Sequence, residues 1–151
     1  MFSKSATDAF KNHLRFLLVD TVDVFRNLID IGRNLDGLQH SQSKKYWDRE
    51  TISAQAAPES SQLFTLNGAS VLIIGFGSIG STIAKMLSGF SVEVIPFTQS
   101  GRDNTIAISN LDKHLPTLDV VILILPLTAE SKHLFNAQRL ALMKDGALLV
   151  N

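Results

Sequence analysis

Four predominantly apolar runs mark the chain from its midpoint onward. They occupy residues 71–74, 92–97, 119–125 and 146–150. Runs of this kind are typical of strands that are buried on both faces of a parallel sheet. Shorter helical patterns lie between the runs, at residues 81–87, 111–115 and 136–143. The alternation of strand and helix predicts an α/β fold with a doubly wound parallel sheet.

The first of these runs leads into a helix through three closely spaced glycines. Gly75 permits the tight turn, Gly77 lets the backbone approach a phosphate without an intervening Cβ, and Gly80 lets the helix pack closely on the strand. The free N–H groups around Ser78 and Ile79 would point at the anion, with support from the helix dipole. The turn predicts a pyrophosphate site in a Rossmann-type sheet, formed by Gly75, Phe76, Gly77, Ser78, Ile79 and Gly80.

The first third of the chain has the periodicity of a helix rather than of a strand. Over residues 8–33 the apolar residues fall on one helical face and the charged residues fall largely on the other. The apolar face consists of Phe10, Leu14, Leu17, Leu18, Val22, Phe25, Leu28 and Ile29. At ~1.5 Å per residue, such a helix would be roughly 40 Å long, enough to cross between two domains or subunits. The alternative is a core helix of the same domain.

The segment after this helix is polar and rich in serine, and it contains the aromatic pair Tyr46 and Trp47. No repeat or low-complexity tract occurs in it. This composition predicts a loop or a loosely packed linker, with Trp47 packed under the loop.

Composition narrows the functional classes. The chain has 151 residues, a formal net charge of +0 and no cysteine. There is no electrostatic case for nucleic acid or an anionic membrane as a partner, and no disulfide or cysteine-based metal site is possible. The four histidines (His13, His40, His114 and His133) lack metal-ligand spacing and are expected to be exposed or packed. Without a signal-peptide pattern or a run of about 18 apolar residues, a cytoplasmic location is expected.

Several motifs occur in an order and spacing that resemble the cofactor domain of the D-isomer-specific 2-hydroxyacid dehydrogenases. They are Leu66-Asn67-Gly68, the glycine turn at residues 75–80, Leu125-Pro126-Leu127-Thr128-Ala129-Glu130-Ser131, Leu134-Phe135-Asn136 and the segment at residues 143–151. The likeness runs from about Leu66 to the last residue, with a weaker match over the preceding helix and Tyr46-Trp47-Asp48.

The resemblance implies a nicotinamide dinucleotide, hydride transfer that interconverts 2-oxo acids and D-2-hydroxy acids, and a homodimer of the complete enzyme. It also implies three parts of this chain: a connecting and dimerisation helix at residues 1–36, a polar linker loop at 37–65 and a partial dinucleotide-binding domain at 66–151. Leu125 and Pro126 would lie beneath the adenosine or nicotinamide ribose, whereas Thr128 is expected to cap the next helical segment.

One position departs from the NAD-using members of that family. Those members carry an acidic residue at the end of the second strand to hold the ribose 2′-OH, and the matching position here is Thr98. A hydroxyl does not repel a 2′-phosphate as a carboxylate would. Thr98, Ser100 and Arg102 could donate to that phosphate, Arg102 as a bidentate fork, and Gln99 belongs to the same site. NADP is therefore expected over NAD; the alternative is a solvated turn in which Arg102 pairs with Asp103.

The resemblance also implies that the family's arginine, glutamate and histidine, which orient substrate, tune a pKa and transfer a proton, lie beyond Asn151, and that the front lobe is absent. The sequence thus predicts a partial domain that is inactive alone and has no catalytic residue or metal site. The strand at residues 147–150 is expected to have an open edge, and the apolar face with Leu14, Leu18, Phe25 and Leu28 to lack its partner lobe, so that the chain is hard to keep soluble and monomeric. The alternative is a non-catalytic dinucleotide-binding or interaction module.

Overall fold

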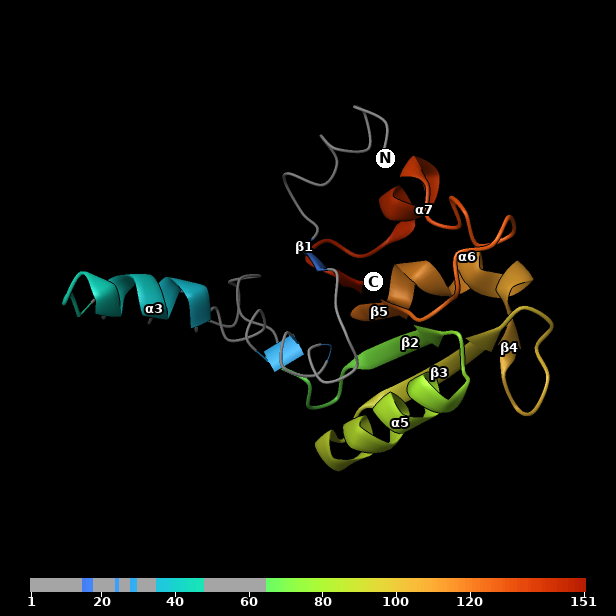
Figure 1. Ribbon diagram of the computed structural model, residues 1–151, viewed down its shortest axis with the longest axis horizontal. Coiled ribbons are helices and arrows are strands. Elements are labelled where there is room, and N and C mark those ends of the chain that lie inside the picture. The colour runs from blue at the N-terminus through green and yellow to red at the C-terminus, as the bar shows by residue number, and fades with distance from the viewer. Residues whose placement is uncertain (1–14, 18–23, 25–27, 30–34, 48–64) are drawn as a thin grey trace.

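Six parallel strands form one sheet whose order in space differs from their order along the chain. The computed structural model describes residues 15–17, 24, 28–29, 35–47 and 65–151. The strands are β1 (Arg15–Leu17), β2 (Ser70–Ile74), β3 (Glu93–Thr98), β4 (Ile106–Ala107), β5 (Val120–Leu123) and β6 (Leu148–Val150). Across the sheet the order is β1-β6-β5-β2-β3-β4 (Figure 1). From β2, the chain adds β3 and β4 on one side and then returns to add β5 and β6 on the other.

Helices cover the two faces of this sheet (Figure 1). The described helices are α3 (Leu35–Ser43), α5 (Ser78–Leu87), α6 (Leu111–His114) and α7 (Ala137–Leu142), with 3₁₀ turns η1 (Ser88–Phe90), η2 (Ile108–Asn110) and η3 (Leu115–Thr117). α5 packs on one face, and α6, η3 and α7 pack on the other. No helix in the described part of the chain is long and apolar enough to cross a membrane.

The strands bury alternate side chains in two separate layers of core. In β2, Val71 and Ile73 belong to the layer under α5, whereas Leu72 and Ile74 belong to the layer under α6 and α7. All four side chains are completely buried. Because successive side chains of a strand point to opposite faces, a strand covered on both faces needs apolar residues at every position. This double coverage explains the nearly continuous apolar runs in the sequence.

The predicted α/β fold with a doubly wound parallel sheet is confirmed. Helix α5 begins at Ser78, three residues earlier than the apolar pattern indicates, since Ser78 and Ile79 in its first turn are exposed and add nothing to an apolar face. The helix predicted at residues 111–115 is α6 followed by η3. Strand β4 was not predicted, because two residues are too few to show a period.

The helix predicted over residues 8–33 is wrong at Arg15–Leu17, which form strand β1. β1 pairs in parallel with β6, where Phe16 lies opposite Leu149. The strand at residues 147–150 therefore has a neighbour on each side, and the predicted open edge is also wrong. A short apolar run does not distinguish a helix from a strand. Here the strand conformation is determined by pairing with a strand more than 130 residues away.

Farther along this segment, Val24, Leu28 and Ile29 are helical, as the pattern predicts. Val24 and Leu28 are buried in the core layer under α5. Leu28 is therefore covered by its own domain, which corrects the expectation that it lacks a partner and agrees with the alternative of a core helix at these positions. Leu14, Leu18 and Phe25 lie outside the described residues. The dimerisation role of residues 1–36 stays a prediction.

The polar linker loop predicted at residues 37–65 is wrong at its start, which belongs to helix α3. This helix projects from the body of the domain (Figure 1). Its residues are mostly polar, so the sequence carries no strong apolar stripe that would indicate a helix. Trp47, four residues after the helix ends, is 82% exposed. The expectation that Trp47 packs under a loop is therefore wrong as well.

Leu28→Ala should lower the free energy of unfolding by about 2–5 kcal/mol, because it empties a fully buried position in the core layer under α5. Ile29→Ala is the matched control, since Ile29 is the next residue and is 36% exposed. The measurement is urea denaturation of both variants followed by circular dichroism. Equal losses for the two variants would show that the N-terminal segment does not pack on the sheet in this way.

Candidate functional site

A cavity of about 340 Å³ opens at the carboxyl ends of three neighbouring strands. It lies where the chain order reverses, between β2, which is followed outward by β3, and β5 on its other side. In open α/β sheets, ligands bind in the crevice at such a switch point. The lining residues are Gly75, Phe76, Gly77, Thr98, Gln99, Arg102, Asp103, Thr105, Ile124, Leu125 and Pro126.

The glycine turn between β2 and α5 has no room for a side chain at two of its three glycines. Gly75 has a φ of +99°, and a Cβ there would lie 1.9 Å from the carbonyl oxygen of Ile124. A Cβ on Gly80 would lie 2.3 Å from the carbonyl oxygen of Gly75. In contrast, a Cβ on Gly77 would meet nothing within 4 Å. The close backbone packing therefore requires glycine at Gly75 and Gly80. At Gly77 the missing side chain leaves space open on the cavity side.

The first turn of α5 offers its backbone N–H groups without competition from side chains. Gly77 is the N-cap and makes no side-chain cap hydrogen bond, and the first turn contains no acidic residue. The hydroxyls of Ser81 and Thr82 both donate to the carbonyl oxygen of Ser78, at 3.0 and 2.7 Å. Because these hydroxyls face the carbonyl, they do not satisfy the N–H groups at the helix start. The positive end of the helix dipole is thus available to an anion.

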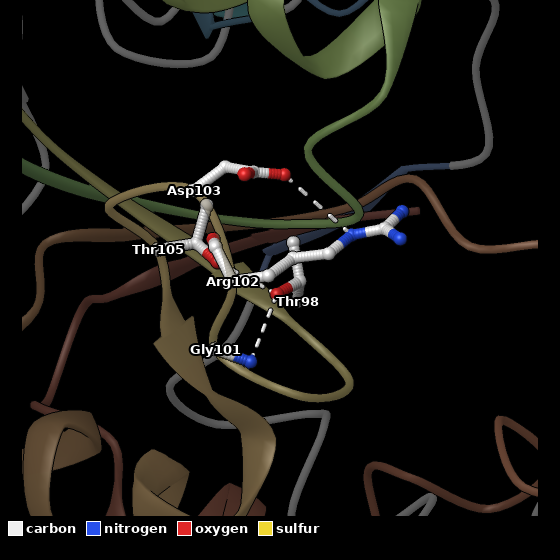
Figure 2. Close-up of polar contacts among 5 residues, drawn as sticks. All are labelled: Thr98, Gly101, Arg102, Asp103 and Thr105. Atoms are coloured by element: carbon white, nitrogen blue, oxygen red, sulfur yellow. Dashed lines mark hydrogen bonds and ion pairs between the residues drawn. The ribbon is translucent and has the colours of Figure 1, made fainter.

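The second wall of the cavity is the turn that joins β3 to β4. Figure 2 shows the polar contacts within this turn. Thr98, the last residue of β3, accepts a hydrogen bond from the Gly101 N–H at 3.1 Å and contacts the Thr105 hydroxyl at 2.6 Å. The Thr105 hydroxyl in turn donates to the carbonyl oxygen of Arg102. The Arg102 side chain is 78% exposed and lies 3.8 Å from the Asp103 carboxylate.

The position of Arg102 is consistent with both interpretations of this segment, a solvated turn and a phosphate-binding site. Arg102 pairs with Asp103, as expected for a solvated turn, and it also lines the cavity. An ion pair between two side chains this exposed contributes only about 0–1 kcal/mol. Such a pair does not commit the guanidinium, which stays available to a bound anion.

The third wall follows β5, where Ile124, Leu125 and Pro126 line the cavity. The next segment is held by hydrogen bonds among its own residues. The Thr128 hydroxyl accepts from the Ser131 N–H at 3.2 Å, and the Ser131 hydroxyl donates to the Pro126 carbonyl oxygen at 2.7 Å. Thr128 thus caps as predicted, although the segment that it caps is a turn and not a helix. The Thr128 hydroxyl and the backbone N–H of Glu130 hold the pKa of the Glu130 carboxyl below its ordinary value.

The structure brings most of the predicted site residues together, but not all of them. Among the lining residues are Gly75, Phe76, Gly77, Thr98, Gln99, Arg102, Leu125 and Pro126. Ser78, Ile79 and Gly80 belong to the first turn of α5 behind this lining, and Ser100 is exposed on the turn after β3. Three lining residues, Asp103, Thr105 and Ile124, were not predicted. Ile124 could have been found from its position beside Leu125, but Thr105 is brought to the cavity only by the reversal of the chain after Thr98.

No histidine is among the lining residues of this cavity. His114 packs edge-to-face on Phe97, with ring centroids 5.3 Å apart, while His40 and His133 are exposed and His13 lies outside the described residues. Within the described ranges, no polar or charged residue is buried and no three metal-ligating side chains gather. The cavity combines backbone N–H groups and the Arg102 guanidinium with an apolar wall, which are features of a binding site for an anionic, partly apolar ligand.

Comparisons with known proteins agree with this geometry. A family model described as "D-isomer specific 2-hydroxyacid dehydrogenase, NAD binding domain" matches residues 25–151. The glyoxylate reductase of Thermococcus kodakarensis is 30% identical over 129 residues, which are 82% of this chain and 38% of that protein. The glyoxylate reductase of Pyrococcus horikoshii is 36% identical over 93 residues, or 58% of this chain and 28% of that protein.

Among solved structures, a D-isomer specific 2-hydroxyacid dehydrogenase family protein from Aeromonas salmonicida superposes with a TM-score of 0.69. It is 31% identical, and the match covers 85% of this chain and 40% of that one. This chain thus spans less than half of the length of each of these relatives.

Gly80→Ala should lower the free energy of unfolding by about 1–3 kcal/mol, because the new methyl group would collide with a backbone oxygen that cannot rotate away. Gly77→Ala should lower it by less than Gly80→Ala does, since that methyl group would enter open space and the only expected loss is the lower N-cap preference of alanine, about 0.5 kcal/mol. Urea denaturation of the two variants makes the comparison. If Gly80→Ala proved as stable as Gly77→Ala, the close approach of α5 to the end of β2 would be refuted.

Proposed function

Because this chain belongs to the D-isomer specific 2-hydroxyacid dehydrogenase family through its NAD-binding domain, we propose that its cavity holds a nicotinamide dinucleotide. The resemblance inferred from the motifs is thereby confirmed. One observation carries the proposal: the glycine turn, the turn after β3 and the end of β5 line the same cavity at the switch point of the sheet.

The three walls fit the three parts of such a ligand. The start of α5 would hold the pyrophosphate, because its N–H groups are unpaired by side chains and a Cβ at Gly77 would occupy the approach. The turn after β3 would hold the adenosine ribose. Leu125 and Pro126 would give an apolar surface under a ribose or the nicotinamide. When bound, the nicotinamide supplies hydride chemistry.

For the complete protein, we propose the interconversion of 2-oxo acids and D-2-hydroxy acids. Support comes from the family and from the two relatives that are named glyoxylate reductases. In this proposal the described residues bind and orient the dinucleotide. Proton transfer would be carried out by groups outside the cavity lining, which contains no histidine.

We propose further that the preferred dinucleotide is NADP. The family description names NAD, and NAD-binding sheets of this kind place a carboxylate on the ribose 2′-OH at the end of the second strand. Here that strand ends at Thr98, whose side chain carries no charge. Arg102 lines the same cavity and offers a planar pair of donors to a 2′-phosphate. A phosphate competes well for this guanidinium, because its exposed pairing with Asp103 is weak.

The full chain should bind NADPH about tenfold or more tightly than NADH, since a charge-assisted hydrogen bond is worth roughly 1.5–3 kcal/mol. Arg102→Ala should remove this preference and leave NADH binding unchanged. Dissociation constants come from titrations of dinucleotide fluorescence. Lys113→Ala is the control, because it removes one exposed positive charge on α6, outside the cavity lining. Equal binding of NADPH and NADH by the unchanged chain would refute the proposed preference.

Gly77→Val should abolish the binding of both dinucleotides while the circular dichroism spectrum stays that of the unchanged chain. The added side chain has room in the folded protein, but that room is the space proposed for the pyrophosphate. Gly89→Val is the matched control, since a Cβ at Gly89 in η1 also meets nothing within 4 Å and lies outside the cavity lining. Retained affinity in a well-folded Gly77→Val variant would show that the pyrophosphate binds elsewhere.

A further inference from the structure

We propose that Thr105 is a positioning residue that selects the dinucleotide by holding Arg102 in place. Its hydroxyl lies in the cavity wall at the centre of a hydrogen-bond chain that runs through Thr98, Thr105 and Arg102 (Figure 2). This inference rests on the proposed preference for NADP, in which Arg102 binds the 2′-phosphate.

Counting the hydroxyl protons shows which group donates at each hydrogen bond of this series. A threonine hydroxyl has one proton, and that of Thr105 is donated to the Arg102 carbonyl oxygen. Across the 2.6 Å contact between Thr98 and Thr105, Thr98 must therefore be the donor. Thr98 also accepts from the Gly101 N–H at 3.1 Å. The only proton of Thr98 is thus committed within the turn. On this proposal Thr98 orders the turn, in contrast to the expectation from the sequence that Thr98 donates to the 2′-phosphate.

These hydrogen bonds hold a tight turn whose two central residues are left-handed. Asp103 and Asn104 have φ values of 53° and 61°, and the Arg102 carbonyl oxygen accepts from the Thr105 N–H at 3.0 Å. Two central residues with positive φ are typical of a type I′ turn, which favours asparagine, aspartate and glycine. Asp103 and Asn104 are tolerated in this conformation, which surrounding hydrogen bonds stabilise further. The second hydrogen bond to the Arg102 carbonyl, from the Thr105 hydroxyl, is such a contact.

The same turn is fixed from its other side by Gly101. This residue has a φ of +72°, and a Cβ there would lie 2.8 Å from the backbone nitrogen of Ala107. The backbone of Arg102 is therefore held between a glycine packed against β4 and a carbonyl that accepts two hydrogen bonds. The Arg102 side chain is 78% exposed and has no strong partner of its own, so its direction depends on this backbone. A fixed backbone reduces the entropy that the guanidinium loses when it binds an anion.

Thr105→Val tests the proposal, because valine has the shape of threonine and lacks the hydroxyl. In the full chain, NADPH binding should weaken about five- to tenfold, the effect of one net hydrogen bond on affinity, while NADH binding should change less than about twofold. Thr105→Ser keeps the hydroxyl and should restore NADPH binding to within about twofold of the unchanged chain. A merely structural loss would weaken both dinucleotides together.

Thr117→Val is the matched control. The Thr117 hydroxyl also donates to a carbonyl three residues earlier, that of His114, at 2.9 Å, and Thr117 lies outside the cavity lining. This variant should bind both dinucleotides as the unchanged chain does. Adding Thr105→Val to Arg102→Ala should have no further effect on NADPH, since Thr105 acts through Arg102.

The outcomes separate this proposal from the one on which it rests. If the unchanged chain shows no preference for NADPH, both proposals fail. If the chain prefers NADPH and Arg102→Ala removes the preference, but Thr105→Val retains it, only the role of Thr105 is overturned. A measurement on the unchanged protein is independent of folding of the variant: the Gly101 and Thr105 amides should exchange hydrogen more slowly than those of residues 103 and 104. Equal exchange at all four amides would also overturn the proposal.

Discussion

The close approach of helix α5 to the end of strand β2 is the constraint on which the site depends. The carbonyl oxygen of Gly75 leaves no room for a methyl group on Gly80, and the carbonyl oxygen of Ile124 leaves none on Gly75. Three segments, the end of β2, the start of α5 and the exit of β5, therefore meet with their backbones in close contact. This contact aims the N-terminus of the helix at the crevice between β2 and β5, where a phosphate gains both unpaired N–H groups and the helix dipole.

The opposite end of the sheet is tied together by a side chain. The Asp119 carboxylate accepts from the Ser70 N–H at 2.9 Å and from the Lys144 ammonium at 2.8 Å. Asp119 precedes β5, Ser70 begins β2 and Lys144 precedes β6, so one carboxylate links the amino ends of three adjacent strands. With this end tied and both faces covered by helices, the carboxyl ends of the strands are left to form the cavity. The packing and the site are thus consequences of the same strand order.

The cavity divides recognition between backbone and side chains. The part proposed for the pyrophosphate would need only N–H groups and the absence of a Cβ, so it would depend on the glycines and on the position of α5. The part proposed for the ribose would depend on side chains of a left-handed turn, in which Thr98 and Thr105 order the backbone and Arg102 carries the charge. Under the proposed function, the phosphate site depends on the backbone, whereas the turn after β3 would set the choice between two dinucleotides.

The sequence by itself determined the features that depend on local pattern. Continuous apolar runs indicated strands buried on both faces, and the spacing of Gly75, Gly77 and Gly80 indicated the turn into α5, because glycine has a distinct physical reason at each position. The tertiary structure alone decided what depends on partners far away in the chain. Arg15–Leu17 form a strand because β6 has an edge to pair with, and Leu28 is buried because the sheet covers it. Thr105 joins the site because the chain reverses after Thr98, and no periodicity records such a contact between side chains across a turn.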